Sequence, residues 1–328
     1  MGRNNDTMKP VLNFLFVLIF LGGTLVAGGS NSAVQPGNHQ EIIHLKTASG
    51  TLEGELLIPQ NIRRPPVVLI IAGSGPTDRD GNNPSMKNNS LKFLAEGLAD
   101  KGIASLRYDK RGVGGSSGAI GKESELRFEN FVSDAEGWIG LLRKDKRFKG
   151  IYVAGHSEGS LIGILAVQNE KVRGLISIAG AGRSIDLVLK EQLGSQPDTL
   201  KKMAYPILDS LKVGKTVQKI PAPLYALFRP SVQPYLISWL RYDPGKEIAR
   251  LKIPVLILQG TSDIQIGTED ARILAKNSYH PRLVIVEGMN HILKTSGPNR
   301  LENMMTYSNP DLPVKKELID SIYEFICR

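Results

Sequence analysis

The 328-residue sequence contains a single cysteine, Cys327, and only five histidines. One cysteine cannot form an intramolecular disulfide, so the fold must rely on its hydrophobic core. The histidines lack the spacing of metal ligands, and we expect no metal site. Runs of five or more Lys or Arg are absent, and basic residues do not interleave with aromatic ones, so nothing indicates a nucleic-acid partner. The spacing G-x-G-x-x-G after an apolar run is also missing, which argues against a dinucleotide-binding oxidoreductase.

The composition is that of an ordinary folded protein. Hydrophobic residues make up 41% and charged residues 22% of the chain, which excludes wholesale disorder. The length fits one α/β domain with insertions. The net charge of +9 reflects either solubilising lysines or a weak attraction to anionic membrane surfaces or acidic substrates. The oligomeric state is not indicated by any of these features.

The first thirty residues have the order of regions that is typical of a secretory signal peptide. Arg3 and Lys9 precede an apolar run at 11–21, and a stretch rich in small residues follows at 22–30. The run is shorter than the about 20 apolar residues that a membrane-spanning helix needs. We therefore expect residues 1–29 to be a signal peptide and the protein to be exported, either periplasmic or secreted. An uncleaved N-terminal membrane anchor is the alternative.

Beyond this segment, short apolar runs alternate with helical patterns. Continuous Val, Ile and Leu strands separated by helices predict a mostly parallel, doubly wound sheet with helices on both faces, an α/β fold. The first two strands, at 41–46 and 52–59, are expected to form a hairpin. Further strands are expected at 67–73, 103–109, 150–157, 172–180, 253–260 and 282–288, and helices at 90–100, 128–145, 159–168, 269–277 and 315–326.

The segment 183–250 differs from the rest because it has no strand-like run. It combines seven prolines with helical patterns and is too long for a plain connection between two strands. We expect it to be a helical lid inserted into a core made of residues 40–182 and 251–328. The segment holds eleven Lys or Arg and six Asp or Glu, so the lid is expected either to give a binding site a cationic rim or only to carry solvated charges. Its aromatic residues either line that site or seat the lid on the core; they are Tyr225, Phe228, Tyr235, Trp239 and Tyr242.

The sequence Gly155-His156-Ser157-Glu158-Gly159 matches G-x-S-x-G, a sharp strand-to-helix turn that exposes a nucleophilic serine. Ser157 closes an apolar strand and opens a helix, as this turn requires. A second match places Ser116 in a glycine-rich loop followed by a polar stretch. The context therefore favours Ser157 as the nucleophile.

A serine hydroxyl needs a base to take its proton. His39 and His44 precede the core strands, and His156 occupies the variable position of the motif. His280 precedes a strand, whereas His291 follows that strand, at the sheet edge where active sites gather. Elimination and position both select His291.

The base in turn needs an acid to orient it. Asp263 follows the strand at 253–260 and gives the order serine, aspartate, histidine that hydrolases with this turn carry. Asp186, just past the preceding strand, is the rival.

Two backbone N–H groups should stabilise the charge that develops on the substrate oxygen. One is expected from Glu158, which follows the nucleophile. The other is expected from Ser74, with Gly75 as the alternative, in the loop after the strand at 67–73. Asp78, Arg79 and Asp80, later in this loop, and Asp109 and Arg111, in the loop after the next strand, are expected to brace these loops.

Five segments together resemble a known family: AGSGPTDRDGN, RYDKRGVGGS, GHSEG, LQGTSD and GMNH. From Val67 onward the sequence resembles the α/β-hydrolase superfamily, in the serine-aminopeptidase-like branch that includes bacterial carboxylesterases. Ala72 departs from the histidine that many members have before the oxyanion-binding glycine. The resemblance implies an α/β-hydrolase fold and hydrolysis of a small-molecule acyl ester without a metal or an organic cofactor.

We therefore expect a serine hydrolase that cleaves carboxylic esters through Ser157, His291 and Asp263. A peptidase or a thioesterase would use the same three residues, and the sequence does not separate them. A binding protein on an inert hydrolase fold is a third alternative, which the three filled positions disfavour.

Overall fold

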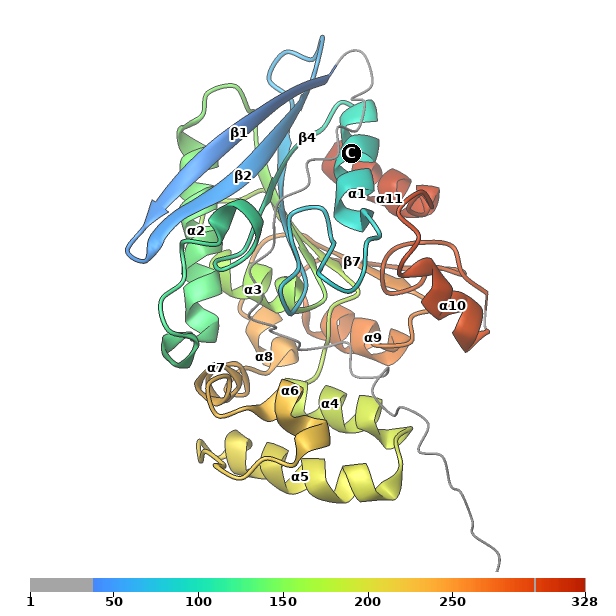
Figure 1. The fold of residues 1–328 in the computed structure, drawn as a ribbon. Coiled ribbons are helices and arrows are strands. Elements are labelled where there is room, and N and C mark those ends of the chain that lie inside the picture. Colours follow the sequence, from blue (N-terminus) through green and yellow to red (C-terminus); the bar gives the residue numbers. More distant parts are fainter. Residues whose placement is uncertain (1–37, 298, 328) are drawn as a thin grey trace, which may run out of the picture.

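The computed structural model describes residues 38–297 and 299–327. The expected signal peptide and its cleavage site lie outside the described residues. Eight strands form one sheet in the order β1-β2-β4-β3-β5-β6-β7-β8 (Figure 1). Along the chain the strands are β1 (Asn38–Thr47), β2 (Gly50–Pro59), β3 (Val67–Ile71), β4 (Ala104–Tyr108), β5 (Ile151–His156), β6 (Gly174–Ile178), β7 (Val255–Gly260) and β8 (Pro281–Val286).

The sheet is antiparallel only at one end. β1 and β2 form the predicted hairpin, and β2 pairs with β4 in antiparallel orientation. All later neighbours are parallel, so the carboxyl ends of β3, β5, β7 and β8 lie at the same edge of the sheet. This edge receives the loops that carry Ser74, Ser157, Asp263 and His291.

Helices cover both faces of the sheet, as the apolar strands predict. The side chains of Leu69 and Ile71 point to one face, and those of Val68 and Ile70 point to the other. The five strands from β3 to β7 are wholly buried except at Tyr152, because both faces are covered. On the face of Leu69 lie α2 (Phe128–Lys144), α3 (Glu158–Ala166) and α9 (Thr268–Asn277), and on the face of Val68 lie α1 (Ser90–Asp100) and α11 (Lys316–Cys327).

A helical insertion connects β6 to β7 and lies beyond one end of the sheet (Figure 1). We call this segment, residues 183–250, the insertion. Its helices are α4 (Ile185–Gly194), α5 (Asp198–Lys212), η4 (Ala222–Leu224), α6 (Tyr225–Phe228), α7 (Gln233–Trp239) and α8 (Pro244–Ile248). The insertion packs on the core through contacts of α7 with α2 and of α8 with α3 and α9.

One helix of the described chain, α10 (Arg300–Thr306), was not predicted. Its sequence RLENMMT is short and has no clear apolar period, and Leu301 and Met305 remain exposed. The side chain of Asn299 caps this helix by accepting hydrogen bonds from the amides of Leu301 and Glu302. Within 38–297 and 299–327, no helix is both long and apolar enough to cross a membrane.

Candidate active site

Ser157 occupies a strained turn between β5 and α3. Its φ of 55° and ψ of −118° lie in a region that non-glycine residues rarely adopt. The turn requires the two flanking glycines. A Cβ on Gly155 would collide with the backbone of Gly159, and a Cβ on Gly159 would collide with the carbonyl oxygen of Ile71. The motif is therefore present as the sharp turn that the sequence predicts, with the serine at its apex.

The structure brings His291 and Asp263 to this serine. His291 lies in the loop after β8, and its Nε2 is 3.1 Å from Oγ of Ser157. Nδ1 of the same ring is 2.8 Å from Oδ2 of Asp263. The side chains of His291 and Asp263 are almost completely buried, so water competes little for these contacts. The three residues form one hydrogen-bonded series from carboxylate to hydroxyl.

Several donors hold the carboxylate of Asp263. Oδ1 accepts hydrogen bonds from the amides of Gln265 at 2.8 Å and Ile266 at 3.0 Å, and Oδ2 accepts one from Nε2 of Gln259 at 3.0 Å. Burial alone would raise the pKa of Asp263, but the attraction of His291 and these hydrogen bonds outweigh burial and lower the pKa. Asp263 is thus an ionised partner for the imidazole. Gln259 was not predicted, although a glutamine in the otherwise apolar strand VLILQG is a signal that could have indicated it.

His156, the variable residue of the G-x-S-x-G motif, contacts the base directly. Its Nε2 is 2.7 Å from the carbonyl oxygen of His291. Burial, followed by the nearby His291, lowers the pKa of His156 to about 3, so the ring is neutral at physiological pH. Because a carbonyl oxygen only accepts, Nε2 of the neutral ring carries the proton and donates it. His156 therefore fixes the backbone of His291.

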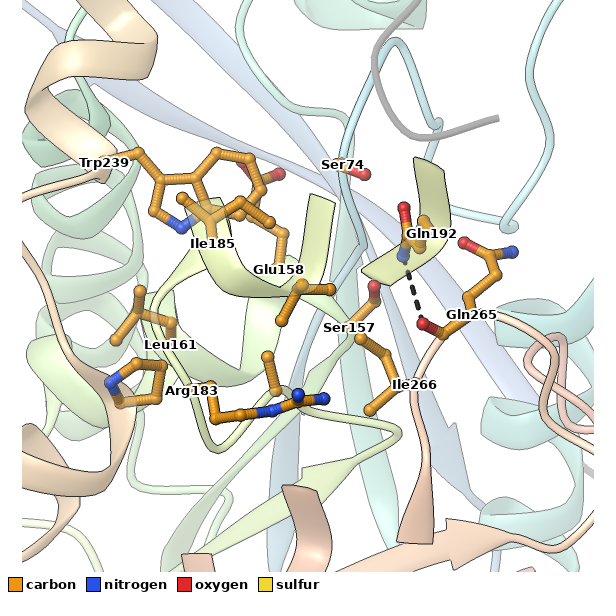
Figure 2. A pocket seen from close by; sticks show the side chains of 13 residues that line it. Ser74, Ser157, Glu158, Leu161, Arg183, Ile185, Gln192, Trp239, Gln265 and Ile266 are labelled. Carbon is orange, nitrogen blue, oxygen red and sulfur yellow. Dashed lines mark hydrogen bonds between the residues drawn. The ribbon is translucent and has the colours of Figure 1, made fainter. Parts of the chain in front are cut away.

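Ser74 and Glu158 lie beside Ser157, in the lining of the same small cavity (Figure 2). Glu158 is the first residue of α3, where amides have no intrahelical acceptor. Gly73 makes the close approach of the Ser74 loop feasible, because a Cβ on Gly73 would lie 3.2 Å from Cβ of Ser157. Gly75 has a φ of 74°, which glycine adopts without strain. Both residues that are predicted to supply the oxyanion amides thus line the same cavity as the serine.

The cavity is narrow, and its lining is mostly apolar. Its free volume is about 30 Å³, enough for a small group only. The insertion supplies much of its wall (Figure 2), including residues of α4, α7 and α8. A larger cavity of about 560 Å³ lies next to it and shares Gln192, Gln265 and Ile266 with its lining. The apolar wall residues of the small cavity are Leu161, Ala181, Ile185, Val188, Trp239, Pro244 and Ile266.

The rival candidates lie elsewhere in the fold. Oγ of Ser116 donates to the carbonyl oxygen of Asp109 at 2.8 Å and accepts from the amide of Glu53 at 2.9 Å. The carboxylate of Asp186 pairs with Lys212 at 2.8 Å. Neither residue contacts His291 among the described interactions. Of these serines and aspartates, Ser157 and Asp263 are the ones that the described interactions bring to His291.

The loop-bracing residues also have the predicted contacts. Arg79 bridges Glu53 and Asp109, and Arg111 forms a two-pronged ion pair with Asp134. These pairs join the loops after β3 and β4 to β2 and α2. They hold the loop that carries Ser74 in place.

The aromatic residues of the insertion mostly anchor it to the core. Trp239 stacks on Phe128 of α2 with ring centroids 5.5 Å apart, and Tyr235 packs edge-on against Phe131. Tyr225 is 54% exposed. Of the five aromatic residues expected for the lid, Trp239 is the one that lines the small cavity. More of these five aromatic residues therefore pack the insertion on the core than line the cavity.

Comparison with known proteins finds a family model and a curated protein to which this chain is similar. The family model of serine aminopeptidases S33 matches residues 87–227, which include the Ser157 turn but end before Asp263 and His291. Esterase EstD of Thermotoga maritima is 28% identical over 258 residues, which are 74% of this chain and 58% of the esterase. The chain thus spans somewhat more than half the length of this curated relative.

Solved structures of similar fold include two esterases. Est1E of Butyrivibrio proteoclasticus, solved with bound ferulic acid, has a TM-score of 0.58 at 19% identity, covering 87% of this chain and 99% of that one. Esterase Pf2001 of Pyrococcus furiosus has a TM-score of 0.55 at 15% identity, covering 88% and 92%. The fold is therefore the α/β-hydrolase fold. The chain is thus similar to the serine aminopeptidase S33 family over part of its length and to Esterase EstD, as the sequence resemblance leads one to expect. The fold class expected from the sequence is confirmed.

Proposed function

We propose that this protein is a serine hydrolase that cleaves carboxylic esters, with Ser157 as nucleophile, His291 as general base and Asp263 as orienting acid. The hydrogen-bonded series from Asp263 through His291 to Ser157 is the observation that carries this proposal. A serine held 3.1 Å from a buried imidazole, whose other nitrogen faces an ionised carboxylate, has the arrangement that nucleophilic catalysis needs.

In the first half of the reaction, Oγ of Ser157 attacks the carbonyl carbon of the ester while Nε2 of His291 takes the hydroxyl proton. The amides of Ser74 and Glu158 stabilise the oxyanion of the tetrahedral intermediate. Collapse of the intermediate breaks the bond to the alcohol oxygen, and His291 protonates the departing alkoxide. The acyl group remains on Ser157, and Asp263 stays ionised throughout.

In the second half, His291 takes a proton from water, and the resulting hydroxide attacks the acyl carbonyl. A second tetrahedral intermediate occupies the same oxyanion site. Its collapse releases the carboxylic acid and returns the proton from His291 to Ser157. No group beyond the side chains and amides already described is needed for this cycle.

Esters are favoured over amides and thioesters as substrates because the similar curated protein, Esterase EstD, is named as an esterase. A panel of p-nitrophenyl esters, acyl thioesters and aminoacyl amides, each with the same acyl group, tests this preference. The highest kcat/KM is expected for the esters. A higher kcat/KM for an aminoacyl amide would identify a peptidase instead, and one for a thioester would identify a thioesterase.

The substrate proposed for this site is a neutral small molecule. Arg183 is the basic residue in the lining of the small cavity, and its guanidinium already pairs with Asp270 and Glu191. Lys212 of the insertion is likewise paired, with Asp186. These pairs offset the positive charge of the insertion near the site. They therefore argue against a cationic rim that would attract anionic substrates. The kcat/KM for a neutral ester should then change little with ionic strength.

A binding protein without activity is the alternative from another class. A fluorophosphonate probe distinguishes the two, because it reacts only with an activated serine. We expect stoichiometric labelling of Ser157, and a protein that binds small esters yet resists the probe would support the binding function.

We further propose that the protein is exported by its N-terminal segment. The support is the order of charged, apolar and small residues in 1–30. N-terminal sequencing of the exported protein should begin between Ala27 and Ala33. A membrane-bound product that starts at Met1 would establish an anchor instead.

A further inference from the structure

Lys110 is a buried lysine that the proposed mechanism does not use. Its side chain is 3% exposed, in the loop after β4. Burial of a lysine costs free energy unless its ammonium group is hydrogen-bonded and paired. Nζ of Lys110 donates a hydrogen bond to the carbonyl oxygen of Gly73 and lies 3.6 Å from Oε2 of Glu158. It also lies over the ring of Phe131, 5.7 Å from the centroid.

These contacts involve one peptide group of the oxyanion site and the side chain of the residue that carries the other proposed amide. The carbonyl of Gly73 belongs to the same peptide as the amide of Ser74. Because a peptide is planar and trans, its carbonyl and its N–H point in opposite directions, and fixing one fixes the other. The second contact holds the side chain of Glu158, whose own amide is the other proposed donor. One ammonium group therefore restrains the orientation of the Ser74 N–H and also holds the side chain of Glu158.

The insertion takes part in the same network. The hydroxyl of Tyr235, on α7, donates to Oε1 of Glu158. Tyr235 is 2% exposed and packs against Phe131, the residue whose ring lies below Lys110. Burial lowers the pKa of Lys110 and raises that of Glu158, and the attraction between the two groups opposes both shifts. Removing one partner would leave the other buried without compensation.

We propose that Lys110 is a positioning residue for the oxyanion site, and that Glu158 and Tyr235 connect it to the insertion. The inference rests on the proposed serine hydrolase function. Lys110 stabilises the transition state without touching the substrate: its hydrogen bond aims the Ser74 amide and polarises that peptide. Packing of α7 on the core completes the network through Tyr235.

The test must separate positioning from a merely structural role. Lys110→Met alone would leave Glu158 buried and unpaired, so a loss of folding in this variant would report on the buried charge rather than on the oxyanion site. The double variant Lys110→Met/Glu158→Gln removes the buried charge, and the amide oxygen that it introduces still accepts a hydrogen bond from Tyr235. We expect its melting temperature to return close to that of the wild type.

We expect the double variant to lose about 10- to 100-fold in kcat for p-nitrophenyl acetate, with KM within about 3-fold of wild type, since oxyanion contacts act mainly in the transition state. The inhibition constant of phenylboronic acid, which forms a tetrahedral adduct with the serine, should rise by a similar factor. If Lys110 had only a structural role, the double variant with a recovered melting temperature would also have the kcat of the wild type.

The insertion offers matched controls. Nζ of Lys212 contacts a carboxylate, Asp186, at 2.8 Å and a backbone carbonyl, that of Leu240, at 3.1 Å, as Lys110 does. Lys212→Met/Asp186→Asn should therefore leave kcat unchanged. Likewise Tyr235→Phe should lower kcat, whereas Tyr242→Phe, which removes a hydrogen bond of 2.8 Å to Glu129, should not.

Two outcomes would overturn the inference. Wild-type kcat and boronate affinity in Lys110→Met/Glu158→Gln would refute the positioning role while leaving the proposed esterase function intact. A wild-type protein that neither hydrolyses the ester nor reacts with a fluorophosphonate would refute the proposed function and this inference with it.

Discussion

Nε2 of His156 donates a hydrogen bond of 2.7 Å to the carbonyl oxygen of His291, so the residue before the proposed nucleophile holds the proposed base. The two residues are 135 positions apart in the sequence. Their rings lie 5.0 Å apart at an angle of 50°. The serine turn therefore presents its hydroxyl to the imidazole and also fixes the loop that carries the imidazole.

His156→Leu removes this hydrogen bond and should lower kcat by about 3- to 10-fold, the effect of one ordinary hydrogen bond. His156→Gln keeps a donor near the position of Nε2 and should stay close to wild type at pH 7.5. Steady-state kinetics with one ester measure both. Equal losses in the two variants would show that the donor is irrelevant.

The same residue predicts a pH dependence of stability. The pKa of His156 is about 3 in the folded protein, below its ordinary value of 6.5. The contribution of His156 to the free energy of unfolding is therefore complete above pH 6.5. It is lost as the pH falls toward 3, because the unfolded chain takes up the proton at a higher pH than the folded protein does. Urea unfolding at pH 7.5 and 4.5 measures the free energy of unfolding. Between these two pH values it should fall less for His156→Gln than for wild type. The difference should be up to about 1.4 kcal/mol per pH unit, and an unchanged loss would contradict it.

Asp263→Asn should lower kcat by about 10³- to 10⁴-fold, because the imidazole loses its ionised partner. Asp186→Asn is the matched control, since Asp186 pairs with Lys212 instead of His291. It should change kcat little. If the two effects were reversed, the acid would have to be Asp186, in the first turn of α4.

Gly155 and Gly140 test the backbone geometry of the serine turn. A Cβ on Gly155 would overlap the backbone of Gly159, whereas one on Gly140, in α2, would meet no atom within 4 Å. Gly155→Ala should therefore abolish folding or lower the melting temperature sharply. Gly140→Ala should stabilise the protein by up to about 1 kcal/mol through helix propensity. Thermal unfolding compares them, and a tolerated Gly155→Ala would show that the turn is not as tight as described.

Trp239 limits the small cavity beside Ser157, whose free volume is about 30 Å³. Trp239→Ala should shift the preferred acyl chain to greater length and also cost about 3 kcal/mol of stability, because Trp239 stacks on Phe128. A series of p-nitrophenyl esters from acetate to decanoate measures the shift. An unchanged chain-length profile would place the acyl group in the larger neighbouring cavity.

Local patterns in the sequence predict most of this fold and the three residues of the hydrogen-bonded series. The apolar strands, the G-x-S-x-G turn and the ends of β7 and β8 are local features, and parallel strands bring their carboxyl ends together. His156 and Lys110 could not be predicted in this way. Each is defined by a partner that only the tertiary fold supplies: the carbonyl of His291 for the first, and the carbonyl of Gly73 with Glu158 for the second.

The roles of the charged and aromatic residues of the insertion could not be predicted from the sequence either. Its charge and aromatic content left two roles open, a cationic binding rim or solvated charges with aromatic residues that seat the segment on the core. The structure pairs Lys212 with Asp186, which offsets the charge of this lysine. Tyr235 and Phe228 are buried in the core, where they help to anchor the insertion. A count of residue types cannot reveal which of them are paired or buried.

The central claim is that Ser157 is the nucleophile. The most direct test is the turnover of a short p-nitrophenyl ester by Ser157→Ala and by Ser116→Ala, with circular dichroism to verify folding. We predict that Ser157→Ala loses at least about 1000-fold in kcat while Ser116→Ala stays near wild type. Full activity in Ser157→Ala, or its loss in Ser116→Ala alone, would contradict the assignment.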